Sequence, residues 1–169
     1  WGYDLSAACS GFLFALESGA ALIESKRCKK VIVVGADTMS SILNFQDRNT
    51  CILFGDGAGA VLLEPSKDYG IIDSELKIDG NGGKYLKMNA GGSLLPATHE
   101  TIEKKMHYVV QDGKNVFKYA VKGMADISHE VANRNDLKAE DIALLIPHQA
   151  NKRIIDAMSK RLGLHESQV

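Results

Sequence analysis

Residues 10–25 form a long apolar stretch, and the β-branched run 30–37 follows it after a short basic segment. The first stretch carries only Glu17 and Glu24 as charges, so it predicts a helix buried between layers rather than an amphipathic surface helix. The second run, KVIVVGAD, is typical of a strand buried on both faces of a mixed or parallel sheet. With a strand-like run over residues 1–5, this order of elements predicts an α/β fold.

The rest of the chain continues this alternation with one interruption. We expect two strands around a glycine-rich turn over 51–64, a strand over 70–79, loop and edge structure over 80–112, an amphipathic helix over 114–134, a strand and loop over 141–150, and a helix over 151–162. The glycines over 55–60 lack GxGxxG spacing and lie between expected strands, so we interpret them as a structural turn rather than a nucleotide-binding loop.

Composition narrows the classes of function. The formal charge of −1 comes from 20 basic and 21 acidic residues, so no global field favours nucleic acid or a membrane surface. The three cysteines lack the spacing of a disulfide framework or a metal site, and we expect a reducing, cytoplasmic setting. Since the chain begins with Trp1 rather than Met and stops just after a helix-like stretch, we expect it to be an internal piece of a longer protein.

Cys9 is the strongest candidate nucleophile. The segment DLSAACSGF places this cysteine among small residues where a strand gives way to the first helix. A helix N-terminus offers a positive dipole end and unpaired backbone amides, which favour a thiolate and can hold an oxyanion. A small, inert core cysteine is the structural alternative.

His148 is the candidate partner of Cys9. It follows the apolar run ALLI and Pro147, where α/β sheets place functional groups at the carboxyl ends of strands. Only the fold can bring together residues so far apart in sequence, and from the residues alone a structural histidine is equally compatible.

Four motifs occur in order along the chain: DLSAACSGF, DRNTCILFGDGAGAVLLE, GKNVFKYAV and IPHQANKRI. Together they resemble the β-ketoacyl-acyl carrier protein synthase III family of condensing enzymes. This resemblance implies a thiolase-like five-layered αβαβα sandwich, here incomplete, in a protein that is usually dimeric. Residues 1–80 would be the C-terminal part of the first half, 81–112 connecting loops, and 113–169 the N-terminal part of the second half.

The same resemblance implies roles for individual residues. Cys9 would carry the acyl group and His148 would be the second member of a Cys-His-Asn triad, whose Gly-Asn-Thr motif is not in this chain. Arg48 would contact the coenzyme A nucleotide, and Met39 and Phe54 would line the acyl pocket. The carrier-protein contact segment would comprise Gln149, Ala150, Asn151, Lys152 and Arg153, joined by a basic stripe of Arg153, Lys160, Arg161 and Lys118 that is equally compatible with a solvated helix face.

The implied reaction is decarboxylative condensation of an acyl-coenzyme A, acetyl-coenzyme A being the expected one, with malonyl-acyl carrier protein. It needs coenzyme A thioester as substrate and no further cofactor or metal. Three alternatives stay open: a Cys-His acyltransferase or hydrolase, a specialised polyketide or quinolone starter synthase, and an inactive part of a larger enzyme.

Overall fold

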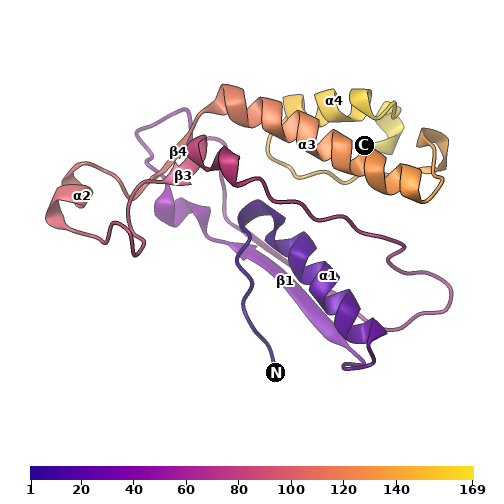
Figure 1. Ribbon diagram of the computed structural model, residues 1–169. Coiled ribbons are helices and arrows are strands. Elements are labelled where there is room, and N and C mark those ends of the chain that lie inside the picture. The colour runs from indigo at the N-terminus through magenta and orange to yellow at the C-terminus, as the bar shows by residue number, and fades with distance from the viewer. The chain divides into compact units, whose positions relative to one another are not determined.

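The computed structural model describes all of residues 1–169, which form two compact units. Unit 1 comprises residues 1–37 and 56–77, and unit 2 comprises residues 38–55 and 78–169. Each unit is described by itself below, with the element labels of Figure 1. No helix is long and apolar enough to cross a bilayer.

Unit 1 is a helix packed on a two-stranded sheet. The 3₁₀ turn Ala8–Ser10 leads into α1 (Gly11–Glu24), which lies along β1 (Val31–Asp37) in Figure 1. β1 pairs antiparallel with β2 (Gly57–Leu63) over the full length of both strands. The predicted helix over 10–25 and strand over 30–37 are therefore confirmed to within one residue at each end.

Gly19 sets the distance between α1 and the sheet. It is the one buried residue of α1, and a Cβ built on it would lie 2.9 Å from Leu63 Cδ1 and 3.1 Å from Val33 Cγ2. At such separations the Leu63 and Val33 side chains would have to shift to admit a Cβ, so glycine allows the backbone of α1 to lie close to β1 and β2. This close contact fixes the helix that follows Cys9.

Three expectations for strands in and around unit 1 are wrong. Residues 1–7 and 70–79 are irregular, and residues 51–53 form a turn, so only the second half of the 51–64 pattern is a strand. Strands need a hydrogen-bonded neighbour, and the only sheet of unit 1 has two strands. For the same reason β1 is buried on one face only: Ile32 is 70% exposed and Val34 58%.

Unit 2 combines short 3₁₀ turns with a small sheet and three helices. Its strands β3 (Leu86–Met88) and β4 (Val109–Gln111) pair antiparallel. Its helices are α2 (His99–Glu103), α3 (Gly113–Arg134) and α4 (Lys152–Arg161). The 3₁₀ turns are Met39–Ile42, Gly80–Lys84, Ala139–Asp141 and Glu166–Gln168. The stretch predicted as connecting loops thus contains two short strands and a helix, and its place between two halves stays a prediction.

The long helices α3 and α4 pack against each other and hold the core of unit 2. Ala125 of α3 is completely buried, and Ile154 and Met158 of α4 are buried as the apolar spacing in that helix predicts. Asp112 caps α3 by accepting a hydrogen bond from the backbone N–H of Asn115 at 3.1 Å. Both helices are confirmed within one residue of their predicted bounds.

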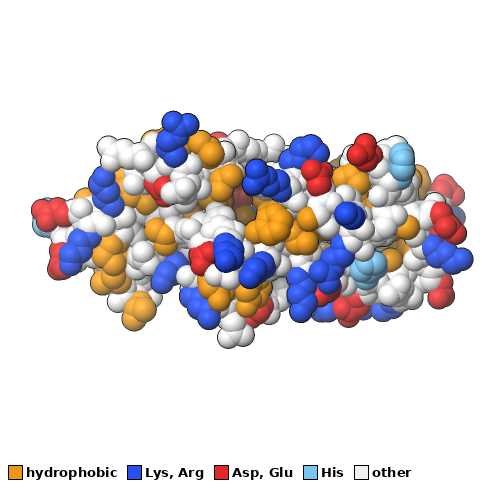
Figure 2. Space-filling model, turned by 90° about the horizontal axis from the view of Figure 1, so that it is seen from above, with side chains coloured by type: hydrophobic (Ala, Val, Ile, Leu, Met, Phe, Trp, Pro, Cys, Tyr) orange, Lys and Arg blue, Asp and Glu red, His pale blue; other side chains and the backbone are white.

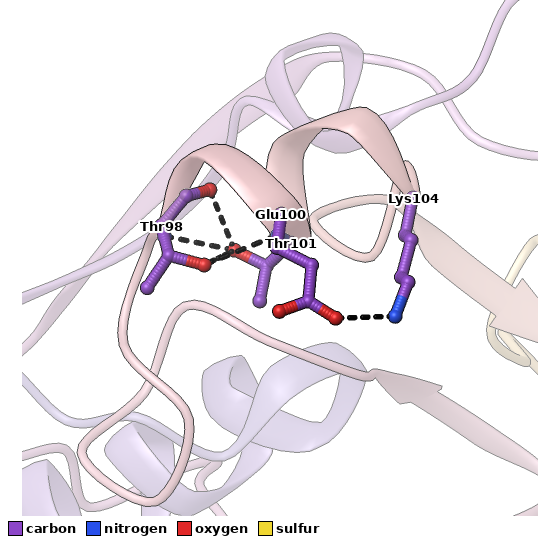
Figure 3. A network of polar contacts seen from close by, with 4 residues as sticks. All are labelled: Thr98, Glu100, Thr101 and Lys104. Carbon is purple, nitrogen blue, oxygen red and sulfur yellow. Dashed lines mark hydrogen bonds and ion pairs between the residues drawn. The ribbon is translucent and has the colours of Figure 1, made fainter.

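The short helix α2 is closed by local hydrogen bonds at its N-terminal end, as Figure 3 shows. The Thr98 hydroxyl accepts from the backbone N–H of Thr101 at 3.2 Å, and the Thr101 hydroxyl accepts from the backbone N–H of Thr98 at 2.9 Å. This reciprocal pair is a capping box. The Thr101 hydroxyl also lies 2.9 Å from Nε2 of His107, so the buried Thr101 ties the start of α2 to the chain that leaves it.

Candidate active site

Cys9 lies at the centre of a tight turn directly ahead of α1. Its neighbour Ala8 has a φ of 47°, in the left-handed region that non-glycine residues seldom adopt. Ser10 follows as the N-cap residue of α1, and no side chain caps the helix there. Cys9 itself is exposed. A strained turn that presents an exposed thiol ahead of a helix is an arrangement typical of functional residues.

The charge environment of Cys9 differs from the expectation for a helix N-terminus. Partial desolvation raises the pKa of the Cys9 thiol, and the nearby carboxylate of Asp37 raises it further. A hydrogen bond from the backbone N–H of Cys9 acts in the opposite direction and does not compensate. These two effects oppose thiolate formation, and stabilisation of a thiolate by the helix N-terminus stays a prediction.

His148 lies in unit 2, in the loop that precedes α4. It is exposed, and the run 141–147 before it forms no strand ladder, because a single backbone bond, from the N–H of Leu145 to the carbonyl of Gln168, joins this run to the end of the chain. The predicted strand is therefore wrong. The loop after His148 turns at Gln149 and Ala150, where the Gln149 amide donates to the carbonyl of Pro147 at 3.2 Å. Cys9 and His148 thus belong to different units, and their pairing stays a prediction.

The side chains of the predicted carrier-contact segment differ in the contacts that they make. Asn151 is the N-cap of α4, its side-chain oxygen accepting from the backbone N–H of Arg153 at 2.8 Å. Lys152 pairs with Asp156 one turn later, at 2.8 Å, and this partner raises the pKa of the Lys152 ammonium. The Arg153 side chain is exposed and forms no ion pair.

The residues of the predicted basic stripe also differ in whether they form ion pairs. Arg161 forms an ion pair with Asp126 of α3, whereas Lys160 and Lys118 are exposed and form none. Figure 2 views the molecule from the side on which α3 and α4 lie in Figure 1, and it shows Lys and Arg mixed with Asp and Glu there. The face is thus one of alternating sign, in which some basic side chains are already paired.

A groove of about 930 Å³ borders α4, and sequence reasoning did not find it. Its apolar lining includes Ile146, Ile155 and Leu164, and its rim includes charged side chains of α4. No local sequence signal marks such a groove, because its walls come from three separate segments. They are residues 144–149, α4, and the last residues of the chain.

Arg48 and Phe54 lie in the loop that separates the two stretches of unit 1, and Met39 lies in the 3₁₀ turn before it. Arg48 is exposed, while Met39 and Phe54 are half-buried. Asp47 organises this loop, because its carboxylate accepts hydrogen bonds from the backbone N–H of Asn49 and from the hydroxyl of the buried Thr50, both at 3.0 Å. These bonds hold the pKa of the Asp47 carboxyl below its usual value.

The described side chains include no cluster of three or more His, Cys, Asp or Glu that could bind a metal ion.

Two family models match the chain and identify its protein family. The model of 3-oxoacyl-[acyl-carrier-protein] synthase III matches residues 3–80, and the model of the C-terminal part of the same family matches residues 132–169. The chain belongs to the synthase III family. The first match contains Cys9, Arg48, Met39 and Phe54, and the second contains His148 and α4.

Relatives of known name agree with this membership. The chain is 57% identical to the β-ketoacyl-[acyl-carrier-protein] synthase III of Chlorobaculum tepidum, over 100% of this chain and 52% of that protein. It is equally 57% identical to the synthase III of Koribacter versatilis, over 97% of this chain and 50% of that protein. The chain thus spans about half the length of the curated synthase III relatives that it matches.

Solved structures establish the fold. The crystal structure of synthase III from Thermus thermophilus matches 99% of this chain and 51% of its own, with a TM-score of 0.87 and 39% identity. The priming β-ketosynthase of the R1128 polyketide pathway matches 100% of this chain and 50% of its own, with the same TM-score and 37% identity. The predicted thiolase-like α/β fold, present in part, is therefore confirmed.

Proposed function

We propose that this chain supplies the acyl-carrying half of a synthase III, which condenses an acyl-coenzyme A with malonyl-acyl carrier protein. The observation that supports it most directly is Cys9, an exposed thiol on a strained turn ahead of α1, inside the segment that the family model matches. Acyl transfer to cysteine needs an accessible sulfur and backbone donors for the oxyanion, and the uncapped start of α1 offers such donors.

In the first step the sulfur of Cys9 attacks the thioester carbonyl of the acyl-coenzyme A. The carbon–sulfur bond to the coenzyme breaks, a new thioester forms on Cys9, and the proton lost by the thiol ends on the sulfur of the departing coenzyme. Since desolvation and Asp37 raise the pKa of Cys9, we propose that this proton leaves as the sulfur attacks.

In the second step the malonyl thioester loses carbon dioxide and becomes an enolate. Its carbon attacks the carbonyl of the acylated Cys9, the thioester bond breaks, and the Cys9 sulfur takes up a proton from solvent. The negative oxygen of the enolate needs hydrogen-bond donors, and we assign His148 to this role. The second donor of the triad, an asparagine, would come from residues beyond this chain.

The loop of Asp47 and Arg48 and the segment from Gln149 to Arg153 complete the proposal. Arg48 is exposed on a loop whose neighbours are fixed by Asp47, so its guanidinium is available to the phosphates of coenzyme A. Arg153, which is exposed and unpaired, is the basic residue of the carrier segment best placed to meet an acidic carrier protein. We also propose a dimeric assembly in a reducing cytoplasm, in which the free cysteines of this chain stay reduced.

A chimera tests the proposal. This chain would replace the matching half of the Chlorobaculum tepidum synthase III, to which it is 57% identical. We expect Cys9→Ala to abolish the acyl adduct seen by mass spectrometry after incubation with acetyl-coenzyme A. We expect His148→Ala to form the adduct but to lose carbon dioxide release from malonyl-carrier protein.

The outcomes separate this function from its alternatives. An adduct on the Cys9→Ala chimera, or unchanged decarboxylation by His148→Ala, would contradict the assigned roles. Hydrolysis of the adduct without condensation would indicate a Cys-His hydrolase. A preference for longer or branched acyl groups would indicate a starter synthase, an option supported by the 37% identity to the R1128 priming β-ketosynthase.

A further inference from the structure

Residue 105 combines an unfavourable backbone conformation with a long charged side chain. Lys105 directly follows Lys104, the C-cap of α2, and has a φ of 54°, in the left-handed region. Its backbone N–H donates to the carbonyl of Ile102 at 2.9 Å, and that of Met106 donates to the carbonyl of Thr101 at 3.0 Å. Glycine, or else asparagine, is the residue that such a helix end favours. Lysine is thus an unfavourable residue for this backbone conformation, and a contact of its side chain would account for its presence.

The Lys105 ammonium provides that explanation, because it donates a hydrogen bond to Oε1 of Gln46 at 2.8 Å. The two residues are 59 positions apart, and both belong to unit 2. Gln46 lies two residues before Arg48. The backbone N–H of Gln46 in turn donates to the side-chain oxygen of Asn44 at 3.1 Å, so the residue that receives Lys105 is itself held.

The loop that receives this contact is anchored at its two ends and exposed between them. Leu43 is buried at one end, and Thr50, only 1% exposed, is buried at the other. Between these anchors the Asp47 carboxylate shapes the backbone locally, but it contacts only residues of the same loop. The contact from Lys105 is thus a side-chain hydrogen bond that links the exposed middle of this loop to another part of unit 2.

Hydrogen bonds outside the loop hold the chain on both sides of Lys105. The capping box of Thr98 and Thr101 closes the start of α2 (Figure 3). The Thr101 hydroxyl also lies 2.9 Å from Nε2 of His107. The backbone N–H of Ala90 donates to the carbonyl of Met106 at 3.0 Å, which joins the segment after Lys105 to the chain before α2. The position of Lys105 is therefore fixed independently of the loop that it contacts.

We propose that Lys105 is a positioning residue, which holds the loop of residues 44–49 so that Arg48 is presented to the nucleotide phosphates of coenzyme A. This inference rests on the proposed function for the identity of the ligand. The bond between Lys105 and Gln46 is solvent-exposed, so it biases the loop toward one conformation rather than locking it. Its loss raises the population of open loop conformations and weakens binding of the coenzyme without touching the reacting atoms.

The loop itself is tested in this chain by limited proteolysis. Trypsin cleaves after Arg48, and the rate of cleavage in a folded protein follows the population of locally open states. We expect Lys105→Met to raise this rate by roughly twofold to tenfold, the range for loss of one hydrogen bond. The sequence around Arg48 is unchanged in this variant, so the protease itself sees the same site.

Two further variants separate positioning from plain stability. Lys104→Met is the matched control, because Lys104 pairs with Glu100 within α2 and should leave cleavage at Arg48 unchanged. Lys105→Gly relieves the left-handed backbone while removing the side chain, so it should leave the urea midpoint of unfolding unchanged or higher and still accelerate cleavage. Unchanged cleavage in both Lys105 variants would overturn the proposal.

The ligand is tested in the chimera with the Chlorobaculum tepidum synthase. We expect Lys105→Met to raise KM for acetyl-coenzyme A by roughly twofold to tenfold with kcat unchanged, and to add little in an Arg48→Ala background. If Arg48→Ala raises KM but Lys105→Met does not, the positioning role is wrong. If cleavage rises but neither variant changes KM, the proposed contact of Arg48 with the coenzyme fails, and the role of Lys105 toward that ligand fails with it.

Discussion

The guanidinium of Arg161 on α4 lies 3.1 Å from the carboxylate of Asp126 on α3. The ring of His129, one turn further along α3, contacts the backbone carbonyl of Arg161 at 3.2 Å. The end of α4 is thus joined to α3 through both the side chain and the backbone of one arginine. Its charge is partly compensated within unit 2, which separates Arg161 from the unpaired Arg153 and Lys160.

We predict that charge reversal affects carrier docking unequally along this stripe. Arg153→Glu and Lys160→Glu should each lower the association rate of the carrier protein with the chimera, because their charges are free to attract an acidic partner. Arg161→Glu should have a smaller effect, because Asp126 already compensates part of the charge of Arg161. Stopped-flow binding at low salt and at 1 M salt measures this, since about 1 M salt shortens the Debye length to roughly 3 Å and should remove the differences. Equal effects of all three substitutions would contradict the division.

We predict a small stability effect for the ion pair itself. Both side chains of the pair are about half exposed, at 48% and 49%, so solvent screens their attraction. Asp126→Ala should lower the free energy of unfolding by no more than about 1 kcal/mol. Urea denaturation followed by circular dichroism measures this, and the loss should shrink further in high salt. A loss of several kcal/mol would contradict the half-exposed position of the two side chains.

Modification of Cys9 should require a higher pH than modification of an ordinary cysteine. Partial burial and the Asp37 carboxylate raise the pKa of the Cys9 thiol. The thiolate should therefore form at a higher pH than in a free cysteine, whose pKa is about 8.5. We expect the rate of iodoacetamide alkylation, followed by peptide mass spectrometry, to rise with a midpoint pH above that of a cysteine-containing peptide.

The raised pKa of Cys9 also affects the stability of the folded chain. Its contribution to stability is fully present below the pKa of the unfolded chain and is lost as pH rises through the pKa of the folded chain.

The Asp37→Asn variant separates the two causes. Removal of the carboxylate should move the alkylation midpoint of Cys9 downward, yet leave it above that of the peptide, because desolvation is the larger cause. A midpoint at or below that of the peptide in the unsubstituted chain would show that the helix N-terminus prevails in solution.

We predict that a branched side chain at residue 19 destabilises the packing of α1 on the sheet. A Cβ at this position would meet Leu63, Val33 and Val31 at 2.9 to 3.2 Å, so Gly19→Val should force α1 away from the sheet and destabilise unit 1 by about 1–3 kcal/mol or more. Gly11→Val is the matched control, because a Cβ on Gly11 would have only one neighbour, at 4.0 Å. Urea midpoints of the two variants provide the measurement, and equal midpoints would contradict the close packing of α1.

The long helices and the strand β1 could be predicted from the sequence, whereas most of the other predicted strands are wrong. The bounds of α1, α3 and α4 follow from apolar spacing and caps, which act within a few residues. The runs 70–79 and 141–147 have strand-like composition, but a strand exists only where another segment pairs with it, and composition does not show that partner. The same reason explains β1, whose apolar residues Ile32 and Val34 are exposed although the pattern predicted burial on both faces.

The roles assigned to the site residues stay predictions, and the contacts around these residues could not be inferred from the sequence. Cys9 and His148 came from motifs, whereas the effect of Asp37 on Cys9 depends on a contact between residues distant in sequence. The pairing of Arg161 with Asp126 and the contact between Lys105 and Gln46 are equally non-local. Sequence reasoning counted the basic residues correctly, but it could not tell which of them already had partners.

The cap of α4 has a consequence for how variation at residue 151 should be interpreted. Because the side-chain oxygen of Asn151 accepts from the backbone N–H of Arg153, the position selects for a short oxygen-bearing side chain. A saturation library at this position, selected only for soluble folded protein, should be enriched in Asn, Asp, Ser and Thr. Tolerance of residue 151 would then reflect the start of a helix, even though the position lies inside the segment that we propose as a carrier contact.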